Sequence, residues 1–116
     1  MSRDLSFWKT EKEIDMKNEA IYTALSDRVV LPHISEIPTD KILEEFIFMF
    51  RDWTNQNNSY FEKDDEAFEL MLTSQFVRVD CHGLTERNMN KIIDIMLEYD
   101  CPLYDSAINV RFNGSE

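Results

Sequence analysis

The stretch "EAFELMLTSQFVRVDCHG" (residues 66–83) indicates the type of fold more directly than any other part of the chain. Every second side chain in its two halves is apolar, at positions Phe68, Leu70, Leu72, Val77, Val79 and Cys81. A period of two is typical of a strand with one face on a core. Ser74 and Gln75 lie between the halves, where a turn would join them. The stretch therefore predicts a β-hairpin.

Two helical segments flank this hairpin. Residues 85–100 have Thr85 as the expected N-cap, and Pro102 follows the end of the segment. Residues 37–55 have Thr39 as the expected N-cap and one broad apolar face. The expected inward positions are Ile42, Leu43, Phe46, Ile47, Met49, Phe50 and Trp53 in the earlier segment and Met89, Ile92, Ile93 and Met96 in the later one.

Three further segments complete the expected secondary structure. The β-branched run "RVVLPHI" (28–34) and the alternating "INVRF" (108–112) predict strands. Residues 10–26 predict an N-terminal helix, because Thr10 and Glu13 have the spacing of a capping box.

Leaving that first helix aside, the expected order is strand, helix, strand, strand, helix, strand. This is the βαββαβ order of ferredoxin-like folds. The two helical segments also align on Thr39 and Thr85, which agrees with two similar halves. We therefore expect a single α+β domain over residues 1–116. Its core, at about 28–112, would be a four-stranded antiparallel sheet with both helices on one face, and the N-terminal helix would be an addition.

The charge balance narrows the classes of partner. The 116 residues include 23 Asp and Glu against 12 Lys and Arg, a formal net charge of −11. Such a surface repels phosphate backbones and anionic lipids, so we expect no direct binding to nucleic acid or to a membrane. A basic protein is the favoured partner. The acidity could equally serve only to keep the protein soluble.

The sequence also suggests a compartment. No apolar run approaches the roughly 20 residues of a transmembrane helix, and the opening residues lack the apolar centre of a signal peptide. We therefore expect a cytoplasmic protein in which both cysteines stay reduced.

Cys81 and His82 are adjacent and could be considered as a nucleophile and its base. Neighbouring residues on a strand point to opposite faces, however, so these two side chains cannot act together in this way. With His33 and Cys101 they make a Cys₂His₂ set by count. In the expected fold a whole helix separates Cys101 from the other three, which excludes both a four-ligand site and a disulfide with Cys81. We expect no catalytic residue, no metal and no cofactor. A weak site near His33 and His82 remains an alternative.

The segment "YFEKDDEAF" (60–68) is the remaining candidate site. Its aromatic and acidic side chains suit recognition of a basic protein, because aromatic anchors supply binding energy and acids supply steering. The predicted contact residues are Tyr60, Phe61, Glu62, Asp64, Asp65 and Glu66. A solvated acidic turn is the competing interpretation.

Glycine-rich phosphate loops and the common hydrolase motifs are absent from the sequence. We therefore predict a non-enzymatic inhibitor that neutralises or regulates a basic protein, as an immunity protein or antitoxin does with a nuclease-type toxin. The alternative is a small cytosolic enzyme or ligand-binding module with its site at the sheet edge near His33 and His82.

Overall fold

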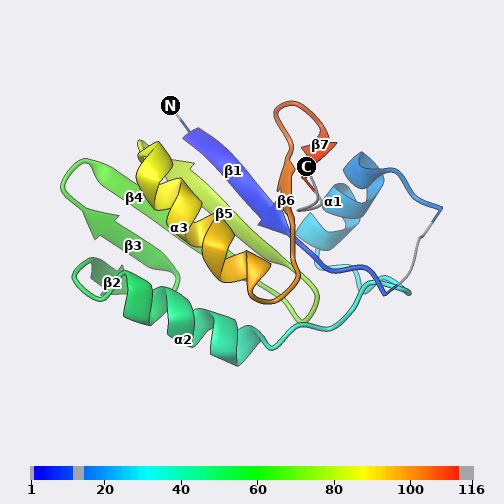
Figure 1. The fold of residues 1–116 in the computed structure, drawn as a ribbon, viewed down its shortest axis with the longest axis horizontal. Coiled ribbons are helices and arrows are strands. Elements are labelled where there is room, and N and C mark those ends of the chain that lie inside the picture. The colour runs from blue at the N-terminus through cyan, green and yellow to red at the C-terminus, as the bar shows by residue number, and fades with distance from the viewer. Residues whose placement is uncertain (1, 12–14, 113–116) are drawn as a thin grey trace.

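The computed structural model of the chain describes residues 2–11 and 15–112. Within them, one antiparallel sheet is formed by β1 (Ser2–Phe7), β2 (Thr54–Gln56), β3 (Tyr60–Lys63), β4 (Glu66–Leu72), β5 (Val77–His82), β6 (Leu103–Asp105) and β7 (Val110–Arg111). The helices are α1 (Asn18–Ser26), α2 (Thr39–Met49) and α3 (Glu86–Leu97). The strand order across the sheet is β2-β3-β4-β5-β1-β6-β7, so the first strand of the chain lies inside the sheet (Figure 1).

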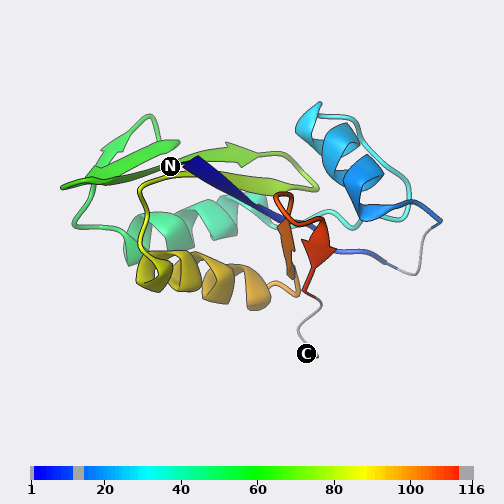
Figure 2. The same cartoon turned by 90° about the horizontal axis from the view of Figure 1, so that it is seen from above.

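The helices lie on both sides of this sheet. α2 and α3 lie side by side on one face, which we call the covered face, and α1 packs at one end of the other face (Figure 2). We call this second face the open face, because no helix of the described residues covers it beyond that end. None of the helices in the described part of the chain is both long enough and apolar enough to span a membrane.

The predicted β-hairpin is confirmed and forms the centre of the covered face. β4 and β5 pair so that Phe68 lies opposite Cys81 and Leu70 opposite Val79. These side chains point to one side, where they join a single buried cluster with α2 and α3. Phe68 is fully buried there. The period-two pattern of the sequence therefore placed the correct side chains in the core.

The two predicted helices flanking the hairpin are also present. Thr85 caps α3, because its hydroxyl oxygen accepts a hydrogen bond from the Asn88 amide at 3.3 Å. Thr39 instead is the first residue of α2, and its hydroxyl donates to the Thr73 carbonyl at 2.9 Å. Pro38 occupies the cap position before it. The residue expected to cap this helix therefore joins it to the hairpin turn.

α1 closes a second and smaller apolar cluster at one end of the open face. Trp8, Phe76 and Tyr104 come from the sheet side, and Ile21 and Leu25 come from α1. All five side chains are buried. This end of the open face therefore has its own core, which the main cluster beneath α2 and α3 does not share.

The expected ferredoxin-like topology is wrong. The position expected for the strand at 28–34 is held by β1, which pairs with both β5 and β6. Residues 28–34 form no strand, since Arg28 and His33 have positive φ angles of 64° and 67°. Val30 is 75% exposed. Intrinsic β propensity did not decide the structure of this segment, because it acts only together with packing. At this place in the sheet β1 supplies the inward-facing apolar residues instead.

The expected ends of the chain also need correction. The N-terminal helix begins at Asn18, and Thr10 forms an isolated bridge with Ile34 instead of starting the helix. Glu13, the other half of the expected capping box, lies outside the described residues. Of the expected strand 108–112, only Val110–Arg111 (β7) is a strand. It pairs with β6 at Leu103–Asp105, which the sequence did not predict, because the chain reverses between the two.

The inward face expected for the last strand is wrong as well. Ile108, Val110 and Phe112 are all exposed, by 59%, 38% and 40%. Two strands that the sequence did not predict, β2 and β3, lie within residues 54–63. These two strands extend the sheet beyond the hairpin at the edge opposite β7.

Candidate functional site

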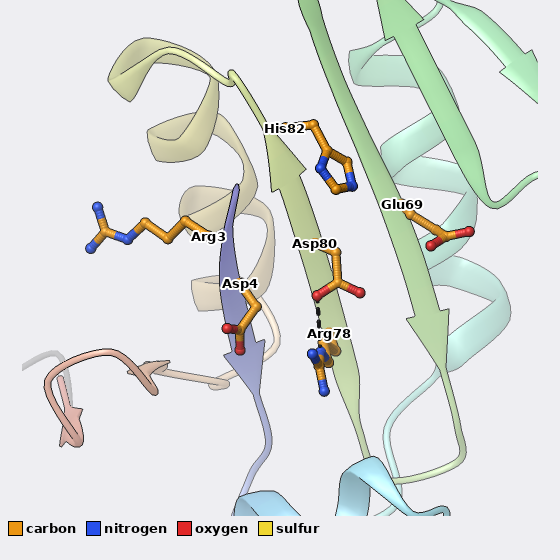
Figure 3. A pocket seen from close by; sticks show the side chains of 6 residues that line it. All are labelled: Arg3, Asp4, Glu69, Arg78, Asp80 and His82. Atoms are coloured by element: carbon orange, nitrogen blue, oxygen red, sulfur yellow. Dashed lines mark hydrogen bonds and ion pairs between the residues drawn. The ribbon is translucent and has the colours of Figure 1, made fainter. Parts of the chain in front are cut away.

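The open face carries carboxylates on three neighbouring strands. Asp4 of β1 lies directly opposite Asp80 of β5, and Asp80 lies directly opposite Glu69 of β4. We call these three residues the acidic row (Figure 3). Directly opposite residues have Cβ atoms about 4.5–5.5 Å apart, and like charges at that spacing destabilise a sheet. The acidic row is therefore an arrangement that folding alone does not favour.

The basic side chains near the acidic row compensate it only in part. The Nε atom of Arg78 donates to Oδ1 of Asp80 at 3.0 Å, and its guanidinium also lies over the ring of Tyr22. Arg3 points away from the row and pairs with Asp105 of β6 (Figure 3). Among residues 2–11 and 15–112, the three carboxylates thus have one ion-paired guanidinium, and two negative charges remain uncompensated.

Asp4 is held in place by hydroxyl groups. Its carboxylate accepts hydrogen bonds from the Tyr22 hydroxyl at 2.8 Å and from the Ser106 hydroxyl at 2.8 Å. Burial, together with the hydrogen bond to Asp4, raises the pKa of Tyr22, so its phenol stays protonated and donates. Tyr22 of α1 and Ser106 in the segment after β6 thereby fix the position of the Asp4 carboxylate at one end of the acidic row.

The acidic row lines a shallow hollow of about 270 Å³, with His82 at one end of it. The hollow is open and polar rather than enclosed and apolar, which is unlike most small-molecule sites. No group of three or more His, Cys, Asp or Glu residues in the described ranges is arranged to hold a metal ion.

The predicted contact segment is divided between the two faces. Tyr60 lies opposite Glu69, beside the acidic row, and is half-buried, while Glu62 is exposed. Phe61 points to the covered face, where its ring stacks on Phe68 at a centroid distance of 4.8 Å. Phe61 is 1% exposed. The structure thus brings Tyr60 to the acidic row and places Phe61 in the core.

The acidic residues later in this segment have separate positions. Asp64 and Asp65 form the exposed turn between β3 and β4. Glu66 accepts hydrogen bonds from the Thr85 amide at 2.7 Å and from the Asn88 side chain at 2.9 Å. The bond from the Thr85 amide is the main cause that lowers the pKa of Glu66. Glu66 therefore stabilises the start of α3, whereas the two aspartates stay available at the surface.

Sequence reasoning did not identify the acidic row. Glu69 and Asp80 both occupy outward positions of the predicted hairpin, so its register could have paired them. Asp4 could not be found in this way, because the opening residues gave no strong strand signal and their pairing with β5 joins distant parts of the chain.

The two histidines are not brought together. His82 pairs with Ser2 at one end of β1. The His33 carbonyl accepts a hydrogen bond from the Glu11 amide at 2.9 Å, beyond the other end of β1. A six-residue strand is about 17 Å long at roughly 3.3 Å per residue step, so the two imidazoles belong to different regions.

Both cysteines are buried and free. Burial raises the pKa of Cys81 to about 12 and that of Cys101 to about 11. A thiol with so high a pKa is a poor nucleophile near neutral pH, because the thiolate is the reactive form. The two cysteines therefore act as apolar core residues in this fold.

Comparisons of the chain with protein-family models, with curated proteins and with solved structures found no match.

Proposed function

We propose that this protein binds a basic protein through the open face of its sheet and thereby neutralises or regulates that protein. It would act as an inhibitor of the immunity-protein or antitoxin kind, without catalysis of its own. The observation that carries the proposal is the acidic row of Asp4, Asp80 and Glu69. Its uncompensated negative charge lies on the open face, of which α1 covers only one end (Figure 2).

The acidic row raises the electrostatic free energy of the unbound protein. Opposed carboxylates repel one another in the free protein, and Lys or Arg side chains of a partner would convert that repulsion into attraction. The net charge of −11 would also speed the encounter with a basic protein. Binding would therefore relieve an electrostatic cost that is built into the sheet.

Tyr60 adds a contact of a different kind. It lies opposite Glu69 at the end of the acidic row and is half-buried, so its ring is held by neighbours while part of it faces solvent. Tyrosine is enriched among the residues that dominate binding energy, because it combines a large apolar ring with a polar hydroxyl. In the proposed complex Tyr60 is the apolar anchor beside the charged contacts.

The alternative, an enzyme or ligand-binding module near His33 and His82, has weaker support. His82 lines the hollow, but His33 lies beyond the far end of β1. A site there would have to use His82 with the carboxylates of the acidic row alone.

The test uses the basic protein that co-purifies with the chain from native lysate at a stoichiometric level. Association and dissociation rates are measured for wild type and for the double variant Glu62→Gln/Glu69→Gln, which removes two exposed charges from the open face. We expect about a tenfold slower association and a weaker salt dependence, since surface charges act chiefly on the on-rate.

The matched control is Glu44→Gln/Asp94→Asn, which removes two exposed charges from α2 and α3 on the covered side. It should bind within about twofold of wild type, because charges beyond a Debye length of roughly 10 Å are screened. An equal loss in both variants would contradict a specific role for the open face. A co-purifying protein without excess positive charge, or none at all, would contradict the proposed class of partner.

A further inference from the structure

A second pocket lies away from the open face, between the turn after β3 and the first turns of α3. It has a volume of about 470 Å³ and includes Trp53, Lys63, Asp64, Glu66, Arg87 and Lys91 in its lining. Small-molecule sites typically occupy about 300–1,000 Å³. The pocket is therefore large enough for a small ligand.

Most of the acidic groups around this pocket already have partners. The Asp52 carboxylate pairs with Lys63 at 2.6 Å, and Glu66 accepts from the Thr85 amide and the Asn88 side chain. The ion pairs found within residues 2–11 and 15–112 include neither Arg87 nor Lys91. After the Asp52–Lys63 pair, the lining holds two cations, Arg87 and Lys91, and two carboxylates, Asp64 and Glu66. Glu66 is held by neutral donors, and neither cation has an ion-pair partner among the described residues.

Arg87 and Lys91 are placed unfavourably for the helix that carries them. They are four residues apart on α3, so they lie on the same side of it, and like charges at that spacing destabilise a helix. Arg87 also lies in the first turn of α3, where the helix dipole disfavours cations. An anion between them would replace this repulsion with two charge-assisted hydrogen bonds.

We propose that this pocket binds a small ligand through an oxyanion, a phosphate or a carboxylate group, held between Arg87 and Lys91. The planar guanidinium suits two-point contact with either group. The Thr85 and Asn88 amides at the start of α3 are already engaged by Glu66 and Thr85, and the proposed site uses the two side chains alone. This inference is independent of the proposed function, because it uses none of the residues of the open face.

Trp53 would contact the remainder of the ligand. Its indole is half-buried and packs edge-on against Phe50 at a centroid distance of 5.1 Å and against Phe68 at 5.7 Å. The core thus holds the indole in place while part of it lines the pocket. A ligand with a flat or apolar part next to its anionic group fits this arrangement best.

The test is a titration of the full chain, labelled with ¹⁵N, with inorganic phosphate and separately with succinate at constant ionic strength. We expect saturable shifts of the Trp53 indole N–H and the Asn88 side-chain amide. Saturation by phosphate alone identifies a phosphate site, and saturation by succinate alone identifies a carboxylate site. Saturation by both identifies a general oxyanion site.

The double variant Arg87→Gln/Lys91→Gln should bind at least about tenfold more weakly, because both charge-assisted contacts are lost. The control Arg28→Gln/Lys41→Gln removes the same two residue types at exposed positions elsewhere and should bind within about twofold of wild type. Equal weakening in both variants would mean non-specific attraction and would overturn the proposal. So would the absence of saturable shifts with either anion in the wild-type protein.

Unfolding can be separated from loss of the site by thermal denaturation. Removal of the Arg87 and Lys91 repulsion should leave the melting temperature unchanged or slightly raised. A lower melting temperature would mean that the two cations stabilise α3, which contradicts the reasoning behind the site.

Discussion

The two faces of the sheet are built from the same strands, yet they have opposite characters. On β3, Phe61 points into the core beneath α2 and α3, and its neighbour Tyr60 points to the open face. On β4, Glu66 turns to the covered side and caps α3, and Glu69 joins the acidic row. The covered face therefore supplies most of the stability, whereas the charges of the open face lower it.

The largest expected change in the free energy of unfolding is the difference between substitutions at Phe61 and at Tyr60. Phe61→Ala should lower the free energy of unfolding by about 3–5 kcal/mol, because it removes a fully buried ring that stacks on Phe68. Tyr60→Ala should lower it by about 1 kcal/mol or less, because the ring is only half-buried. Urea denaturation of both variants checks this difference. Similar losses in both variants would mean that the two faces contribute equally to stability, which contradicts the difference described above.

A smaller effect is expected for Glu66, the carboxylate on the covered side. Glu66→Gln should lower the free energy of unfolding by about 1 kcal/mol at neutral pH, because it weakens the hydrogen bonds that hold the start of α3. Chemical denaturation at pH 7 measures the loss. No loss at all would mean that Thr85 caps the helix without help from Glu66.

The same variant should also change how stability depends on pH. The pKa of Glu66 is lowered in the folded state, so its stabilisation is present above the ordinary glutamate pKa of about 4.3 and is lost as the pH falls through the folded value. The difference between wild type and Glu66→Gln should therefore stay constant from about pH 7 to 5 and shrink below about pH 4. A difference that grows on acidification would contradict the lowered pKa.

The smallest effect is expected on the open face and has the opposite sign. Glu69→Gln should raise the free energy of unfolding by a few tenths of a kcal/mol at low salt, because it removes a charge directly opposite Asp80. The gain should fade at high salt, where the repulsion is screened. Denaturation at low and high salt, with Glu44→Gln as the control on α2, measures it. A loss of stability would show that the acidic row costs nothing to fold.

The parts of the fold that the sequence predicted correctly are those specified by neighbouring residues. The alternation in residues 66–83 identified the β4–β5 hairpin and its buried side, and Thr85 with the spacing of apolar residues identified α3. Such patterns act over a few residues and are visible without knowledge of the rest of the chain. Of the open face, the sequence indicated Tyr60, Glu62, the overall excess of acid and, in the alternative site, His82.

The hairpin, the two covering helices and the negative charge follow from the sequence, because periodicity, capping and composition are local or additive properties. The entry of β1 into the sheet between β5 and β6, in place of residues 28–34, depends instead on the folded chain as a whole. This placement depends on pairing between distant parts of the chain, which no local pattern encodes. It also created the acidic row, because Asp4 meets Asp80 only when β1 lies beside β5.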